Sequence, residues 1–128
     1  MLKSRRPKNQ KGFTLIELLS VLVIMSVMVS VAIKKFDLLS DTAGTNALRA
    51  GIRELNTREA LVWAKIKLSD TGWSNDVDVF NQVNKNIGPG FSWNPIPDIS
   101  SGGTLHYQST SIALLRTGST RNSAGFWR

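Results

Sequence analysis

The chain has 128 residues, of which 41 % are hydrophobic, and carries a formal net charge of +7. Once a basic leader and an apolar segment (residues 1–33) are set aside, about 95 residues remain, enough for one small core. The absence of cysteine excludes a disulfide framework, a thiolate metal site and a thiol nucleophile.

The positive charge is concentrated at the start of the chain. Residues 1–12 contain no acid and five basic residues: Lys3, Arg5, Arg6, Lys8 and Lys11. Without them 11 basic residues face 9 acids, so the net charge falls from +7 to +2. Positive residues that flank an apolar span stay cytoplasmic. We therefore interpret residues 1–12 as a leader on the cytoplasmic side and expect the chain after Ile33 to lie outside the cytoplasm.

The segment Phe13–Ile33 is an apolar run of 21 residues in which Glu17 is the one charged residue. As a helix it extends about 32 Å, enough to cross the hydrocarbon core of a bilayer. It is longer than an ordinary signal-peptide core and lacks a small-residue cleavage site behind it. The run predicts a transmembrane helix with Lys34 and Lys35 at its outer boundary. An uncleaved signal anchor is the plain alternative.

The stretch Gly12-Phe13-Thr14-Leu15-Ile16-Glu17-Leu18 resembles the cleavage motif of type IV prepilins. This motif is shared by type IV pilins and by the pseudopilins of type II secretion and DNA-uptake systems, and the resemblance covers roughly residues 3–36. It implies cleavage between Gly12 and Phe13 by a prepilin peptidase, N-methylation of Phe13, and an assembly platform in the inner membrane. It also implies a filament built with copies of the chain or with other pilins, and an α+β fold in which a long N-terminal helix precedes a small antiparallel sheet.

The span departs from many major pilins, which carry a glycine near its middle and a proline towards its end. Ser26 and the segment Val31–Lys35 stand in those places. We therefore expect a more continuous helix. The departure leaves open whether the chain is a major pilin, a minor pilin or a pseudopilin.

Glu17 needs a partner wherever apolar helices pack together. A lone charge there costs about 2.5–3.5 kcal/mol by insertion scales. A neighbouring subunit's Phe13 ammonium would offset that cost and fix the axial register, because a slipped neighbour leaves both charges unmatched. Two alternatives stay open: Glu17 pairs with the amine of its own Phe13, four residues earlier, or it reaches the membrane surface. Gly12, which has no side chain, lets a protease approach its carbonyl closely.

We expect the helix to continue outside the membrane over residues 34–70. Its apolar positions recur at helical spacing, interrupted by Glu59. They are Leu48, Ile52, Leu55, Val62 and Ile66, with Leu61, Ala64 and Leu68 broadening the stripe. Polar residues and Gly44 between Phe36 and Ala50, with Gly51 just beyond, predict either a bend or a turn that splits the helix. Ser69–Gly72 should end it.

Residues 71–128 read as a small α+β head. Asn75 or Asp76 caps a short helix that Gly88-Pro89-Gly90 ends. Residues 91–101 look irregular, with Phe91 and Trp93 in the core. Antiparallel strands are expected over Thr104–Thr110 and Ser111–Thr117, with a last edge strand at Phe126-Trp127.

The head offers weak candidates for binding chemistry. Asp70, Asp76 and Asp78 are calcium candidates, although helix ending and capping explain them adequately and no cofactor is otherwise indicated. Arg116, Arg121 and Arg128, without a nearby acid, form a possible basic tip for DNA or acidic polysaccharide. A solvated surface, or acids on a neighbouring subunit, explains them equally simply.

The sequence predicts a structural subunit rather than an enzyme, because the one histidine, His106, has no carboxylate near it in sequence. The first interpretation is a type IV pilus-like subunit, found in the inner membrane and then in an extracellular pilus. The second is a pseudopilin of a periplasmic pseudopilus. The third is a signal-anchored periplasmic binding domain that never polymerises.

Overall fold

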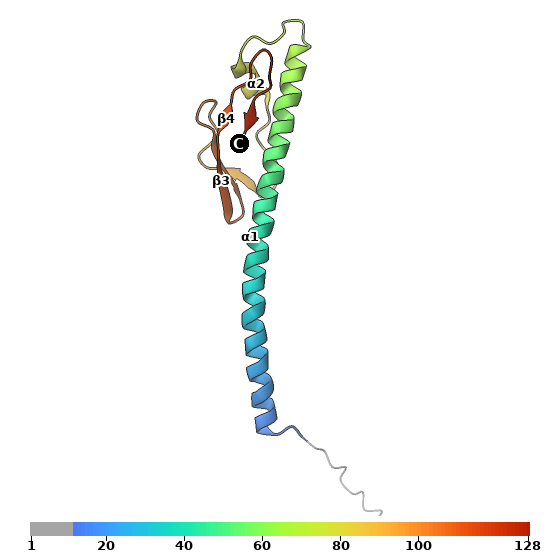
Figure 1. The fold of residues 1–128 in the computed structure, drawn as a ribbon, viewed down its shortest axis with the longest axis vertical. Helices are drawn as coiled ribbons and strands as arrows, with labels where there is room; N and C mark the ends of the chain where they lie inside the picture. Colours follow the sequence, from blue (N-terminus) through green and yellow to red (C-terminus); the bar gives the residue numbers. More distant parts are fainter. Residues whose placement is uncertain (1–11) are drawn as a thin grey trace, which may run out of the picture. The chain divides into compact units, whose positions relative to one another are not determined.

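A computed structural model describes residues 12–128 of the chain. The leader predicted over residues 1–12 therefore lies, except for Gly12, outside the described residues. The chain divides into two compact units, which meet between Leu38 and Leu39. Helix α1 (Leu15–Lys67) has 53 residues. It is unbroken along this length (Figure 1). The expectation of a turn that splits it between Phe36 and Ala50 is wrong.

The long helix and the small antiparallel sheets confirm the predicted pilin-like α+β fold. Within the unit that begins at Leu39, α1 packs against the head along one face. Its buried residues recur at intervals of three, four or seven positions, which all fall on one side of a helix: Gly44, Leu48, Gly51, Leu55, Glu59 and Ile66. Leu61 and Leu68, expected to broaden this face, are 65 % and 87 % exposed. The predicted stripe was therefore too wide.

Gly44 and Gly51 are contact points for the head. A Cβ atom at Gly44 would collide with the side chain of Thr110. At Gly51 it would lie 2.8 Å from Cε1 of Phe91, inside ordinary contact distance. Both glycines therefore let the head approach the helix backbone closely. They do not break the helix.

The end of α1 follows the sequence signals. Gly72 adopts φ +66°, and its N–H donates to the carbonyl of Ser69 at 3.0 Å. Helix α2 (Asp76–Gln82) then begins behind Asn75, whose side chain accepts a hydrogen bond from the N–H of Asp78. Asn75, and not Asp76, is thus the N-cap. The helix ends at Gln82, well before the predicted stop at Gly88.

Within residues 12–128, five short strands form two antiparallel sheets. The first has the order β1-β2-β3 and the second pairs β4 with β5. Their bounds are β1 Phe91–Trp93, β2 Gly103–Tyr107, β3 Thr110–Leu114, β4 Arg116–Thr117 and β5 Phe126–Trp127. The predicted final strand at Phe126-Trp127 is confirmed.

Three details of the sheets differ from expectation. Residues 91–93 form strand β1, because Phe91 and Trp93 pair with Tyr107 and Leu105 of β2. The predicted strand over residues 111–117 breaks at Leu115, and its two halves pair with different partners. The turn between β2 and β3 comes earlier than predicted, since Gln108 carries the positive φ of 52°.

The head has two hydrophobic clusters. The larger one joins α1 to both sheets through Leu48, Leu55, Leu105, Leu114 and Trp127. Phe91 and Trp93 pack against it, as the sequence predicted. The smaller cluster joins α1 to α2 through Ile66, Val79 and Val83. Together the clusters hold the head on the second half of α1.

Candidate functional site

The start of α1 carries a capping box. The N–H of Thr14 donates to Oε2 of Glu17 at 2.8 Å, and the N–H of Glu17 donates to Oγ1 of Thr14 at 3.3 Å. Each side chain thereby satisfies a backbone donor that the first helical turn leaves free. The sequence signal is Thr-x-x-Glu, which our sequence analysis did not use. The carboxylate of Glu17 therefore points back towards Thr14, the residue that follows Phe13.

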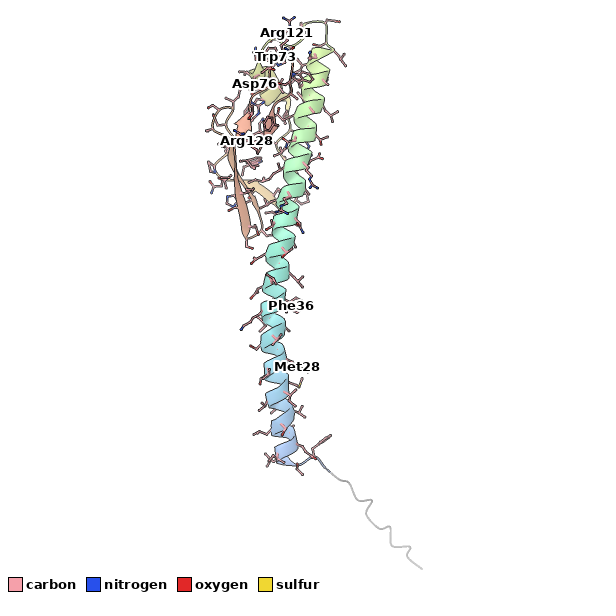
Figure 2. The ribbon with its side chains drawn as sticks, viewed as in Figure 1. Met28, Phe36, Trp73, Asp76, Arg121 and Arg128 are labelled. Atoms are coloured by element: carbon pink, nitrogen blue, oxygen red, sulfur yellow. The ribbon has the colours of Figure 1, made fainter. Side chains whose placement is uncertain are left out.

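The apolar segment behind this box is exposed on every side. From Phe13 to Ile33 each large apolar side chain is at least 50 % exposed, and Phe13 itself is 90 % exposed. Within the described residues, α1 is the helix long and apolar enough to cross a membrane, with a mean hydropathy of 2.5 over its most apolar window. Figure 2 shows side chains, among them Met28, projecting from the ribbon. A helix that is apolar all round is stable only in lipid or among other helices.

A buried ion-pair network ties the head together around Arg116. The Arg116 side chain is fully buried, and its guanidinium contacts two acids. Nε donates to Oε1 of Glu59 at 2.7 Å, and Nη1 donates to Oδ2 of Asp76 at 2.6 Å. Nη2 donates to Oε2 of Glu59 at 3.1 Å and to Oδ1 of Asp76 at 2.9 Å. The network therefore links α1, α2 and β4.

Further donors complete the network. The indole N–H of Trp127 donates to Oε1 of Glu59 at 3.1 Å, and Ser119 donates to Oδ1 of Asp76 through its N–H and its hydroxyl, both at 2.7 Å. Burial raises the pKa of Asp76, but the hydrogen bonds from Arg116 and Ser119 outweigh it and lower that pKa to about 2. Burial lowers the pKa of Arg116, but hydrogen bonds and charges from both acids raise it above its ordinary value. Asp76 and Arg116 are therefore charged at neutral pH.

This network corrects two sequence-based interpretations. Glu59 does not interrupt the buried face of α1, because it lies on that face, fully buried, and binds Arg116. Arg116 does not belong to an exposed basic tip, because it meets acids of its own chain. Arg121 and Arg128 are exposed, and nucleic-acid binding through them stays a prediction.

With this geometry in view, the chain was compared with known proteins. The model of the prokaryotic N-terminal methylation motif matches residues 7–33. The chain carries the type IV pilin and pseudopilin signature. Neither curated proteins nor solved structures gave a match. The signature covers the capping box and the apolar half of α1, and it does not extend to the head of this pilin-like chain.

The calcium candidates of the pilin-like head do not come together. Among the described residues no group of three or more acids or histidines is placed to hold a metal ion. Both carboxylate oxygens of Asp76 are engaged by Arg116, and Oδ2 of Asp78 accepts the hydroxyl of Ser74 at 2.9 Å. Asp70 is exposed. Calcium would have to compete with these bonds, and its binding stays a prediction.

The four tryptophans fasten segments of the head to one another. Each indole N–H has an acceptor, on Thr120 for Trp63, Ser119 for Trp73, Lys85 for Trp93 and Glu59 for Trp127. These bonds and the positions of the rings in or beside the two clusters give all four tryptophans a packing role in the head.

Proposed function

We propose that the chain is a structural subunit of a type IV pilus-like filament. It is anchored in the inner membrane by Phe13–Ile33, cut after Gly12, N-methylated at Phe13 and polymerised through α1, with its head outside the cytoplasm. The observation that carries this proposal is the methylation motif at the start of a helix that is apolar on every side. Such a helix needs lipid before assembly and other helices after it. Proteins with this signature are structural subunits rather than enzymes.

Glu17 sets the register of the filament in this proposal. Cleavage removes the basic leader and creates an amine at Phe13. Phe13 directly precedes Thr14, whose N–H donates to Glu17 in the capping box. Pairing between this carboxylate and a neighbour's Phe13 ammonium removes two uncompensated charges from an apolar environment. A neighbour at the wrong height leaves both unpaired, so the pair selects one axial position.

Mass spectrometry of the mature protein tests the processing. In cells with a functional prepilin peptidase and methyltransferase, the chain is expected to begin at N-methylated Phe13. Gly12→Leu adds a side chain at the cut site, so this variant should accumulate as the uncut precursor. A wild-type chain that keeps Met1 in such cells contradicts the proposal.

Replacement of Glu17 separates the filament subunit from a signal-anchored binding domain. Glu17→Gln should sharply reduce incorporation into filaments while the head stays folded, since Glu17 forms its hydrogen bonds with Thr14 at the start of α1. Glu54→Gln is the matched control, because Glu54 is an acid on the same helix whose half-exposed side chain pairs only with Arg58. An anchored binder would tolerate both changes equally.

The pseudopilin is the second candidate because the same signature covers both classes. Electron microscopy distinguishes them: a pilus extends from the cell surface, whereas a pseudopilus stays in the cell envelope. In a deletion strain, loss of protein secretion or of DNA uptake without loss of surface filaments would assign the chain to the pseudopilins.

A further inference from the structure

Phe36 is a large aromatic side chain placed just beyond the predicted membrane boundary. It follows Lys34 and Lys35 and is 71 % exposed (Figure 2). Asp37 comes next, and the side chain of Leu39 is 63 % exposed. If Lys34 and Lys35 mark the outer boundary of the span, Phe36 lies at the polar surface of the bilayer rather than in its hydrocarbon core. There a second protein surface can bury the Phe36 ring.

The head carries an apolar groove that has room for such a side chain. Its volume is about 490 Å³, and about 150 Å³ is enough for a benzene ring in a protein cavity. Six of its eight lining residues are apolar, and three of these are aromatic. The lining comprises Phe80, Lys85, Asn86, Ile87, Phe91, Trp93, Ile96 and Pro97. At this groove Ile96 is 81 % exposed.

Lys85 is the one charged residue in the lining of the groove. Its ammonium lies 3.8 Å from the centre of the Phe80 ring and donates to the carbonyls of Phe80 and Val83. These two hydrogen bonds leave the positive charge of Lys85 without a carboxylate at the groove within the described residues. An occupant with an aromatic ring and an adjacent carboxylate therefore matches both the apolar lining and this cation.

We infer that Phe36 of one copy inserts into this groove of a second copy, with Asp37 beside Lys85. The inference rests on the proposed filament, because it names the contact between subunits. Phe36 and the groove are different surfaces, so each copy offers one of each. Such a contact is heterologous, and when it repeats without closing into a ring it builds an open helical filament. Buried aromatic anchors in apolar pockets are also the residues that dominate protein interfaces.

Cysteine cross-linking in assembled filaments tests this contact, because the chain has no cysteine of its own. The test variant combines Phe36→Cys with Ile96→Cys, both at exposed positions, so the head should fold. Mild oxidation should link successive copies, giving a ladder of multimers on a non-reducing gel. Each single variant should give no ladder, which excludes links between identical positions. The matched control pairs Phe36→Cys with Arg121→Cys, since Arg121 is exposed and does not line the groove.

Three outcomes are distinguishable. A ladder from the Phe36–Ile96 pair alone, with a disulfide-linked peptide containing both positions, supports the inference. Filaments that form without this ladder overturn the inference and leave the proposed function standing; Phe36 then lies in the membrane interface or against another surface. Absence of filaments from the wild-type chain, in cells with the assembly machinery, overturns the proposed function and the inference with it.

Discussion

Replacing Arg116 with methionine removes the cation at the centre of the buried network. Arg116 donates four hydrogen bonds of 2.6–3.1 Å to Glu59 and Asp76. Glu59 is fully buried and, among the described residues, would keep the N–H of Trp127 as its hydrogen-bond donor. Removing one partner of a buried ion pair costs about 3–5 kcal/mol, because the remaining charge stays without compensation. We therefore expect Arg116→Met to lower the free energy of unfolding of the head by about 3–5 kcal/mol.

Thermal unfolding of the full chain in detergent, followed by near-ultraviolet circular dichroism of the tryptophans, measures this effect. In a domain of this size, 1 kcal/mol corresponds to roughly 4–8 °C in Tm, so a fall of more than about 12 °C is expected. Arg121→Met is the matched control: its side chain is exposed, and a surface substitution changes stability by less than about 0.5 kcal/mol.

A double variant separates the charge from the packing. Arg116→Met with Glu59→Leu leaves no buried carboxylate on α1, so the two changes together should cost less than the sum of their separate effects. The reasoning is refuted if Arg116→Met lowers stability by less than about 1 kcal/mol, or if the two changes are simply additive.

Three further predictions concern single positions. The pKa of Asp76 is lowered from 3.8 to about 2, so the stability that its charge contributes is fully present above pH 3.8 and is lost as the pH falls through about 2. Over this pH range the Tm of Asp76→Asn should depend less on pH than the Tm of the wild type. Gly51→Ala gains about 1 kcal/mol of helix propensity, but the new methyl group meets the Phe91 ring, and such overpacking costs about 1–3 kcal/mol. Chemical denaturation should therefore show that the free energy of unfolding falls by about 1 kcal/mol. A gain in stability would contradict the close approach of Phe91 to Gly51. Thr14→Val removes the capping hydroxyl, so backbone amides in the first turn of α1 should exchange with deuterium faster in micelles, whereas Thr14→Ser should exchange like the wild type.

Local patterns predicted the elements whose causes lie in neighbouring residues. The unbroken apolar run predicted the membrane helix, because its length and composition set its environment whatever the head does. The Asn75 cap and the stop at Gly72 were also readable, since each acts on backbone groups within three residues of itself. The motif around Gly12 and Glu17 was readable because it is contiguous, and its match over residues 7–33 agrees.

Some local signals were misread because they have two meanings. A glycine in a helix indicates either a flexible or broken helix, or a place where another segment packs closely against the helix backbone. The structure shows the second case, because Thr110 packs against Gly44 and Phe91 against Gly51. Strand β1 has three residues, too few for a periodic pattern, and it is recognisable only from its pairing with β2.

The sequence by itself therefore determined a basic N-terminal segment, an N-terminal methylation motif, a helix apolar on all sides and a small α+β head. Only the tertiary structure decided that Glu59 and Arg116 are partners and that both are buried. They lie 57 residues apart, and each alone reads as a surface charge. Burying a charged residue costs less free energy beside its counter-charge than alone. The packing of α1 against β4 brings these two charges together, and no local sequence pattern contains that packing.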